Sequence, residues 1–500
     1  MPNTDTWTPL RVSVALFTAM RAVPKALVQR HLPIVLGSVL VDEDAATVSP
    51  KLQLSSLQME IKGQIRHFLV AADPKVFPGR TPRSDSVLGV GGATNSLLAW
   101  APRNDVSSVL DLGCGGGVQA LAAGMHARHV VGTDILGRAL DIARINAALN
   151  TDLVVTGRVG TPATAALPQT AAQSAKNRRN ATVLALTGKR ATKGDVTPAC
   201  NKFQWLQGDM LAPEAGRTFD LVVSNPPFVI EPAGSLTYRS GGRPGDSLIG
   251  ELVRGIPAVL AEDGCAALIL NWEVRGDWQQ PWQQWLQGLP LDAWVGRREL
   301  LEPWQYVQMW LRDEGLTPDN PQYQQRFTAW VQDFAERSVS GIALGYVLLR
   351  KNSGQVVRRF EDAAGRAPTS EYAEHLWAVF RRASAGGLRQ DSLEKSQFVV
   401  PRDVTEERYY RPGAEHPNVI MYHQGGGTGR QEQVDTALTG LLGACDGTMS
   451  IGTIIDALAQ LLGQDRTALT DQLIPTVRDF YWWGFLRDRS EAVDCNDSDA

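Results

Sequence analysis

A glycine-rich stretch around residue 113 is the part of the sequence best suited to binding a ligand. Residues 109–121 read VLDLGCGGGVQAL, an apolar strand pattern that runs into a tight turn and then into a helix. Glycines let a ligand approach the backbone, and the N-terminus of a helix offers unpaired N–H groups. Asp134 ends the next predicted strand, where a carboxylate can accept hydrogen bonds from both hydroxyls of a ribose. This spacing predicts a nucleoside site.

Departures from the dinucleotide fingerprint indicate which nucleoside would bind. Counted from Gly113, the pattern G-x-G-x-x-G would place its third glycine at Val118, so the close packing required by a pyrophosphate is not provided. The strand also ends in Asp111, whose negative charge would repel a phosphate but suits a cationic ligand. S-adenosylmethionine meets both demands, because its sulfonium and ammonium groups are cationic. The same observations disfavour a nicotinamide oxidoreductase.

A second candidate site, Asn225-Pro226-Pro227-Phe228, follows another apolar strand pattern. A planar NH2 group is a poor nucleophile while its lone pair is delocalised, so its hydrogens must be held with the lone pair aimed at the methyl group. The side-chain oxygen of Asn225 and the backbone carbonyl of Pro226 can accept those hydrogens. The prolines stiffen the loop, and the ring of Phe228 offers a face for a planar amide or base. An ordinary turn is the alternative, but a position one strand beyond a nucleoside site favours catalysis.

The segment from Asp111 to Gly117 resembles motif I of class I S-adenosylmethionine-dependent methyltransferases. The resemblance implies that the turn from Gly113 to Gly115 cradles the amino-acid part of the cofactor and that Asp134 holds the ribose. It also implies that Asp209 and Met210 reach the adenine, with Asp209 accepting a hydrogen bond from the exocyclic amine. The implied cofactor-binding residues are Asp111, Gly113, Gly115, Asp134, Asp209 and Met210.

The segment Asn225–Phe228 resembles the N-P-P-[YF] motif of amino-group methyltransferases of the HemK-like type. The resemblance implies methyl transfer to a planar NH2 group, with Asn225, Pro226, Pro227 and Phe228 as the catalytic residues. The amide of a glutamine in a translation protein is the leading substrate. An exocyclic amine of an RNA or DNA base is the first alternative, and a non-catalytic module that binds S-adenosylmethionine and an RNA or protein partner is the second.

Alternating strand and helix patterns must position these motifs. From residue 108 to 351 the alternation predicts an α/β, doubly wound, Rossmann-like methyltransferase sheet. Several apolar runs are continuous, as expected for strands covered on both faces. The predicted strands are 108–112, 130–134, 203–207, 221–224, 266–271 and 342–349, and a helix is predicted over 137–149.

The chain divides into four predicted parts, two of them flanking the methyltransferase domain. They are a helical or winged-helix-like accessory domain (1–72), the methyltransferase domain (73–353), a C-terminal accessory domain of possible winged-helix type (354–488) and an acidic tail (489–500). Residues 151–201 form a basic Ala/Thr-rich insertion, which either grips a phosphate backbone or is a solvated expansion without a task. Residues 434–447 resemble part of an actinobacterial-type group of multidomain methyltransferases.

Two further segments flank the predicted site. Residues 87–97, rich in glycine, either close over the cofactor or link two domains. Residues 238–246 form either a substrate-binding lid, with Arg239 or Arg243 facing a phosphate or carboxylate, or a charged surface loop.

Composition limits the remaining possibilities. The 500 residues are 43% hydrophobic and 20% charged, with a formal net charge of -4, so no global positive field attracts nucleic acid. The five cysteines are odd in number and never spaced C-x-x-C, so we expect no metal site and a reducing cytoplasm. With no apolar leader or spanning run in the sequence, we expect no membrane. The resemblance to the HemK-like type implies a macromolecular partner, a translation protein or RNA.

Overall fold

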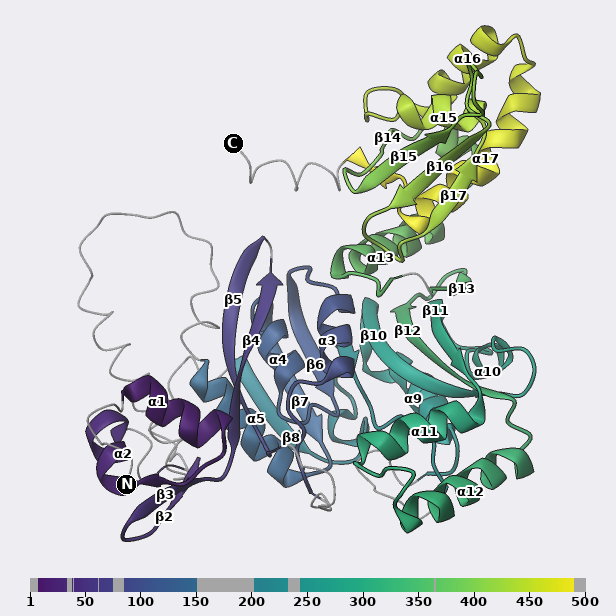
Figure 1. The fold of residues 1–500 in the computed structure, drawn as a ribbon. Helices are drawn as coiled ribbons and strands as arrows, with labels where there is room; N and C mark the ends of the chain where they lie inside the picture. The colour runs from purple at the N-terminus through teal and green to yellow at the C-terminus, as the bar shows by residue number, and fades with distance from the viewer. Residues whose placement is uncertain are drawn as a thin grey trace, which may run out of the picture.

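An eight-stranded sheet forms the centre of the molecule in the computed structural model (Figure 1). The structure describes residues 8–33, 38, 40–61, 63–74, 85–150, 202–232, 243–363 and 366–489. The strands follow the order β13-β11-β12-β10-β9-β6-β7-β8. Their bounds are β6 (Val106–Leu112), β7 (Ala127–Asp134), β8 (Phe203–Gln207), β9 (Phe219–Ser224), β10 (Leu260–Val274), β11 (Leu291–Leu301), β12 (Gly341–Lys351) and β13 (Arg358–Asp362).

Five neighbouring strands, β8, β7, β6, β9 and β10, run parallel, and β12 lies antiparallel to β10. Numbered in chain order, the five parallel strands lie across the sheet in the order 3-2-1-4-5, which is the order of a doubly wound nucleotide-binding fold. The predicted α/β sheet is therefore confirmed, and each of the six predicted strands lies within or overlaps an observed one. The strands β11 and β13 were not predicted, because β11 carries charged residues in its second half and β13 is short and charged.

Helices cover both faces of the sheet. Their bounds are α3 (Gly92–Trp100), α4 (Val118–Ala123), α5 (Gly137–Leu149), α9 (Ser247–Val259), α10 (Gln280–Trp285), α11 (Pro303–Asp313) and α12 (Pro321–Glu336). Successive residues of β6 belong to different cores, with Val109 packing in one and Leu110 in the other. This alternation explains the continuous apolar runs, since both faces of each central strand are buried. The predicted helix 137–149 is α5.

The N-terminal part is less helical than predicted. Two short helical segments, α1 (Pro9–Ser13) and α2 (Lys25–His31), pack with a π-helical turn, η2 (Val14–Thr18), and a small three-stranded sheet of β1 (Val23–Pro24), β3 (Thr47–Pro50) and β2 (Val41–Glu43). The helical interpretation of residues 53–72 is wrong, because β4 (Gln53–Ile61) and β5 (Gln64–Ala72) form a long hairpin. Leu57, Met59 and Ile61 are buried at every second position, which is the period of a strand.

The C-terminal part begins later than predicted. The boundary at residue 354 is wrong, because β13 pairs with β11 at the edge of the central sheet. The helix α13 (Ser370–Ser384) then packs against β12 and α3. The helical sequence patterns of residues 433–444 and 451–462 correspond to α15 (Thr436–Gly443), which begins after a short strand, and to α16 (Ile451–Leu462).

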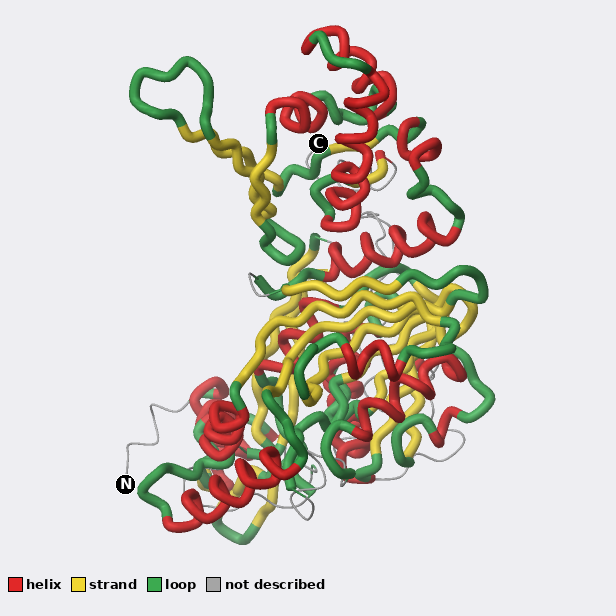
Figure 2. Tube along the Cα trace, turned by 90° about the vertical axis from the view of Figure 1, so that its right-hand side faces the viewer, coloured by secondary structure: helices red, strands yellow, loops and turns green. Residues whose placement is uncertain are grey.

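The remaining C-terminal elements form a separate layer above α13 (Figure 1). They are α14 (Gln390–Glu394), β14 (Phe398–Val399), β15 (Val404–Tyr409), β16 (Val419–Gln424), β17 (Gln431–Val434), α15 (Thr436–Gly443), α16 (Ile451–Leu462), α17 (Arg466–Trp483) and β18 (Arg487–Asp488). The hairpin β15–β16 projects from this layer (Figure 2). The winged-helix character of either end of the chain stays a prediction.

Some expectations fall outside the described residues. These are the basic insertion 151–201, residues 238–242 of the predicted lid, and the tail from 490 onwards. Among the helices that the structure describes, none is both long and apolar enough to span a bilayer.

Candidate functional site

A cavity of about 430 Å³ lies at the carboxyl ends of the parallel strands. The chain leaves β6 for β7 on one side, while β9 lies on the other side of β6, so the cavity opens where the strand order reverses. Ligands of doubly wound sheets bind at this point. The cavity brings together every predicted site residue: Asp111, Gly113, Gly115, Asp134, Asp209, Met210, Asn225, Pro226, Pro227 and Phe228.

Three glycines shape the turn after β6, and they do so for different reasons. Gly113, Gly115 and Gly117 have φ values of 69°, 51° and 75°, in the left-handed region that favours glycine. A Cβ atom at Gly117 would also lie 2.8 Å from the ring of Trp205, so this glycine permits packing beneath the turn. A Cβ atom at Gly115 would meet nothing within 4 Å. Gly115 therefore borders open space, as a glycine that cradles a ligand must.

Two carboxylates, the buried Asp111 and the half-buried Asp134, hold this turn from below. The backbone N–H of Ala120 donates to Asp111 Oδ2 at 2.8 Å, and that of Gly115 donates to Asp134 Oδ2 at 2.9 Å. Burial, with a smaller contribution from the nearby charge of Asp134, raises the pKa of Asp111 to about 7 against the opposing effect of the bond from the Ala120 N–H. Burial also raises the pKa of Asp134. A cation bound beside Asp111 would favour its ionised form, which suits the ammonium or sulfonium expected there.

The chain after β8 contributes the other side of the cofactor pocket. Asp209 and Met210 line the cavity, and Met210 has a φ of 46° that turns the chain there. Arg243 Nη2 donates to Asp209 Oδ2 at 2.9 Å, and Arg243 Nε lies 2.9 Å from Glu251 Oε2. Arg243, expected to face a ligand anion, thus pairs with two carboxylates of the protein. The contact between Asp209 and adenine stays a prediction.

Asn225 has a polar atom that the surrounding protein leaves unsatisfied. Its Oδ1 atom is buried and has no hydrogen-bond partner within the described part of the chain. The preceding residue is firmly anchored, because Ser224 Oγ donates to Leu112 O at 2.7 Å. A buried acceptor without a partner costs free energy, so its presence in a cavity wall indicates a donor that arrives with a ligand.

Helices α11 and α12 hold the chain that follows this motif. The N–H of Ile230 donates to the Tyr306 hydroxyl at 3.0 Å, and Trp330 Nε1 donates to Ile230 O at 2.9 Å. The ring of Trp310 lies 6.3 Å from that of Phe228, measured between ring centroids, and both residues line the cavity. The sequence analysis missed Trp310. It lies far along the chain in an amphipathic helix, and only its place in the fold brings it to the site.

The glycine-rich segment before α3 also reaches the site. Val87, Leu88, Gly89 and the start of α3 line the cavity, which favours the closing interpretation over a plain linker. In the described ranges no group of three or more His, Cys, Asp or Glu side chains could hold a metal ion.

Two family models match parts of the chain. Residues 97–176 match the model described as Ribosomal protein L11 methyltransferase (PrmA), and residues 380–488 match Domain of unknown function (DUF7782). No curated protein matches the chain.

Several solved methyltransferase structures have some likeness to this chain at low sequence identity. The Thermus thermophilus 16S rRNA N2 G1207 methyltransferase, in complex with AdoMet and guanosine, is 18% identical, covers 53% of this chain and 58% of its own, and has a TM-score of 0.26. The ribosomal protein L11 methylase of Lactobacillus delbrueckii subsp. bulgaricus is 17% identical, with 41% and 72% covered and a TM-score of 0.24. A putative methyltransferase of Bacillus halodurans is 14% identical, with 53% and 100% covered and a TM-score of 0.26.

The family match begins in α3 and runs through the glycine turn, Asp134 and α5. The residues there fit S-adenosylmethionine: the turn leaves open space at Gly115, and the buried carboxylate of Asp111, which lines the same cavity, suits a cationic ligand. Because the matched segment is the one that builds the cavity in a doubly wound sheet, this chain has the class I fold and is an S-adenosylmethionine-dependent methyltransferase.

Proposed function

We propose that the enzyme methylates the nitrogen of a planar NH2 group. The observation that carries this proposal is the buried, unpartnered Oδ1 of Asn225 in the wall of the cavity. An acceptor oxygen in this position matches an NH2 donor, whereas a hydroxyl or carbon acceptor would have less use for paired oxygens. Pro226 lines the same wall and supplies a second carbonyl.

Each residue of the site has its own role in the proposed methyl transfer. When bound, S-adenosylmethionine supplies an electrophilic methyl group and leaves as S-adenosylhomocysteine. Asp111 and Asp134 hold the glycine turn and favour a cationic ligand. Asn225 and Pro226 accept the two amine hydrogens, so that the nitrogen lone pair points at the methyl carbon. The nitrogen becomes acidic once it carries the methyl group, and its surplus proton passes to water.

The acceptor in this proposal is the amide of a glutamine in a translation protein. Its support is the matched family model, whose printed description names a methyltransferase of a ribosomal protein, and the absence of a net positive charge in the sequence. Phe228 and Trp310 would flank the flat amide, because both rings line the cavity beside Asn225. A nucleobase amine has the same planar NH2 group and is the competing outcome of the test below.

Methyl-labelled S-adenosylmethionine and a cell lysate would identify the class of acceptor. The lysate is incubated with the purified protein, then divided and treated with protease or nuclease before separation. We expect the label to be lost with protease and kept with nuclease. Label lost with nuclease would overturn the glutamine substrate, and label on a hydroxyl or carbon atom would overturn the planar NH2 group as well.

The role of Asn225 is tested by Asn225→Ala. We expect kcat to fall at least about 100-fold, because the substrate hydrogens lose an oriented acceptor, while the Kd for S-adenosylmethionine stays within a few-fold. Asn352→Ala is the matched control, because Asn352 is a buried asparagine that bonds Asp292 and Ser384 at the other end of the sheet. The control should keep its kcat. Equal losses in both variants, or loss of cofactor binding in Asn225→Ala, would contradict the assigned role.

A further inference from the structure

The edge of β5 is held by two asparagines of α5. The backbone N–H of Leu69 donates to Asn150 Oδ1 at 2.9 Å, and Asn150 Nδ2 donates back to Leu69 O at 2.8 Å. Ala71 makes the same paired contact with Asn146, at 2.7 Å to Oδ1 and 3.0 Å from Nδ2. The two side chains, one turn apart on the helix, thus satisfy the strand edge as a neighbouring strand would.

Only one of these asparagines also reaches the cofactor turn. Asn146 Nδ2 donates to the carbonyl oxygen of Gly116 at 2.8 Å, and the side chain is fully buried. The second bond of Asn150 Nδ2 goes instead to the carbonyl of Asn146, at 2.7 Å. Gly116 lies between two glycines of positive φ, so its carbonyl orientation depends on contacts like this one.

The end of β5 reaches the cavity by a second route. Asp73 follows the strand, and its backbone N–H donates to Val87 O at 3.0 Å, while Val87 N donates to Asp73 Oδ2 at 2.8 Å. Arg138 of α5 also binds the Asp73 carboxylate, with Nε at 3.2 Å from Oδ2. Val87 begins the segment that lines the cavity before α3. The hairpin therefore supports both the glycine turn and this segment.

We propose that Asn146 is a positioning residue for cofactor binding, which joins the N-terminal hairpin to the glycine turn. With its Nδ2 it holds Gly116 and Ala71 together, so an ordered turn and a docked β5 stabilise each other. Thermodynamic reciprocity then requires that a cofactor ligand, which orders the turn, also stabilises the docked hairpin. The inference rests on the cofactor site and is independent of the methyl acceptor.

The variants Asn146→Ala and Asn150→Ala separate this role from simple docking of the hairpin. Each removes a paired contact with β5, but only the first removes the bond to Gly116. With S-adenosylhomocysteine as the probe in a calorimetric titration, we expect Asn146→Ala to raise the Kd about 3- to 10-fold and Asn150→Ala to change it less than about twofold. With S-adenosylmethionine, Asn146→Ala should raise KM and leave kcat nearly unchanged at saturation. Equal Kd values in the two variants would overturn the proposal.

Hydrogen exchange of the wild-type protein tests the same coupling without a substitution. Adding S-adenosylhomocysteine should slow amide exchange in residues 69–72, and the hairpin β15–β16, far along the chain, serves as the internal control. Unchanged exchange in β5 despite measured binding would overturn the proposal. Because the calorimetric titration and the hydrogen-exchange experiment contain no methyl acceptor, failure in these two assays is distinguishable from failure of the proposed N-methylation.

Discussion

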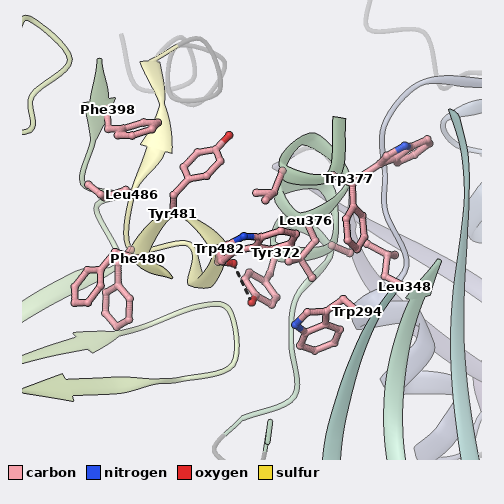
Figure 3. Packing of buried hydrophobic residues seen from close by; sticks show 14 of the residues in the cluster. Trp294, Leu348, Tyr372, Leu376, Trp377, Phe398, Phe480, Tyr481, Trp482 and Leu486 are labelled. Atoms are coloured by element: carbon pink, nitrogen blue, oxygen red, sulfur yellow. Dashed lines mark hydrogen bonds between the residues drawn. The ribbon is translucent and has the colours of Figure 1, made fainter. Parts of the chain in front are cut away.

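The two ends of the central sheet contrast in how they satisfy their buried groups. At the carboxyl end of the parallel strands lies a cavity with the buried Asp111, the half-buried Asp134 and the unpartnered oxygen of Asn225. At the opposite end, the sheet residues Trp294 and Leu348 pack against Tyr372, Leu376 and Trp377 of α13 (Figure 3). The same cluster of aromatic rings extends through Trp482, Tyr481 and Phe398 into the C-terminal layer.

The polar groups that join α13 to its neighbours at this closed end have partners. His375 Nε2 lies 2.6 Å from Tyr481 O, and the Trp377 indole N–H donates to Asp263 O at 3.0 Å. The carboxylate of Asp263 also binds Arg381 Nε at 2.7 Å. Because Asp263 comes before the buried part of β10, these bonds fix α13 to the amino end of that strand. Paired groups and packed rings stabilise a fold, whereas an unsatisfied oxygen is retained where a ligand completes it.

The contrast predicts that substitutions at the closed end change stability and leave the cofactor site intact. The largest effect is expected for Phe380→Ala. Phe380 is fully buried and its ring lies 5.6 Å from that of Trp482, so the cavity left behind should cost about 3–5 kcal/mol of unfolding free energy. Denaturant unfolding measures the loss, and titration with S-adenosylhomocysteine at low temperature should give an unchanged Kd. Weakened binding by a folded variant would show that the two ends are coupled.

At the open end, Asp111→Asn should remove a pH dependence of cofactor affinity. In the wild type, Asp111 with its pKa near 7 is ionised above pH 7 and neutral below it, so a cationic ligand should bind up to about tenfold more weakly at pH 6 than at pH 7.5. Asparagine keeps an acceptor for the Ala120 N–H but does not titrate. Calorimetric titrations with S-adenosylmethionine at both pH values measure the difference in Kd. If the Kd of the variant changes with pH as much as that of the wild type, another group causes the pH dependence.

The same raised pKa has a consequence for stability in the absence of ligand. Ionised Asp111 is disfavoured by burial, so it costs folding free energy above pH 7. That cost is relieved as the pH falls through about 7 toward the ordinary carboxyl value of 3.8. Asp111→Asn should therefore stabilise the ligand-free protein more at pH 8 than at pH 5, as thermal unfolding at the two pH values would reveal. Equal stabilisation at both would contradict the assigned pKa.

The smallest effect is expected for Tyr372→Phe at the closed end. Its hydroxyl donates to Trp482 O at 3.4 Å, and the substitution removes that bond without opening a cavity. We expect a loss of about 1 kcal/mol of unfolding free energy, measured by urea unfolding against the wild type. A loss as large as that of Phe380→Ala would mean that this hydroxyl stabilises the interface by more than its one weak hydrogen bond.

Local signals account for the parts of this protein that the sequence predicted well. The glycine turn, Asp134 and α5 follow one another closely, and their conformations depend on neighbours in the chain, so motif and helix were recognised with their correct bounds. The motif Asn225–Phe228 was recognised for the same reason, because the residues that carry its chemistry are four consecutive residues of the chain. The hairpin of residues 53–72 was missed because its apolar residues, spaced two apart, follow a segment in which the apolar residues have helical spacing.

By itself the sequence determined the parallel strands of the doubly wound sheet and named residues that line the cavity, the motif Asn225–Phe228 among them. Only the tertiary structure decided that Trp310 lies beside Phe228 and that β13 pairs at the edge of the sheet. It also decided that Asn146 joins the N-terminal hairpin to Gly116. These contacts join residues that are distant in the chain, and many different partners would satisfy the same local pattern. Which partner is used is decided by packing of the whole chain, because burial and hydrogen bonding are satisfied together only in the folded protein.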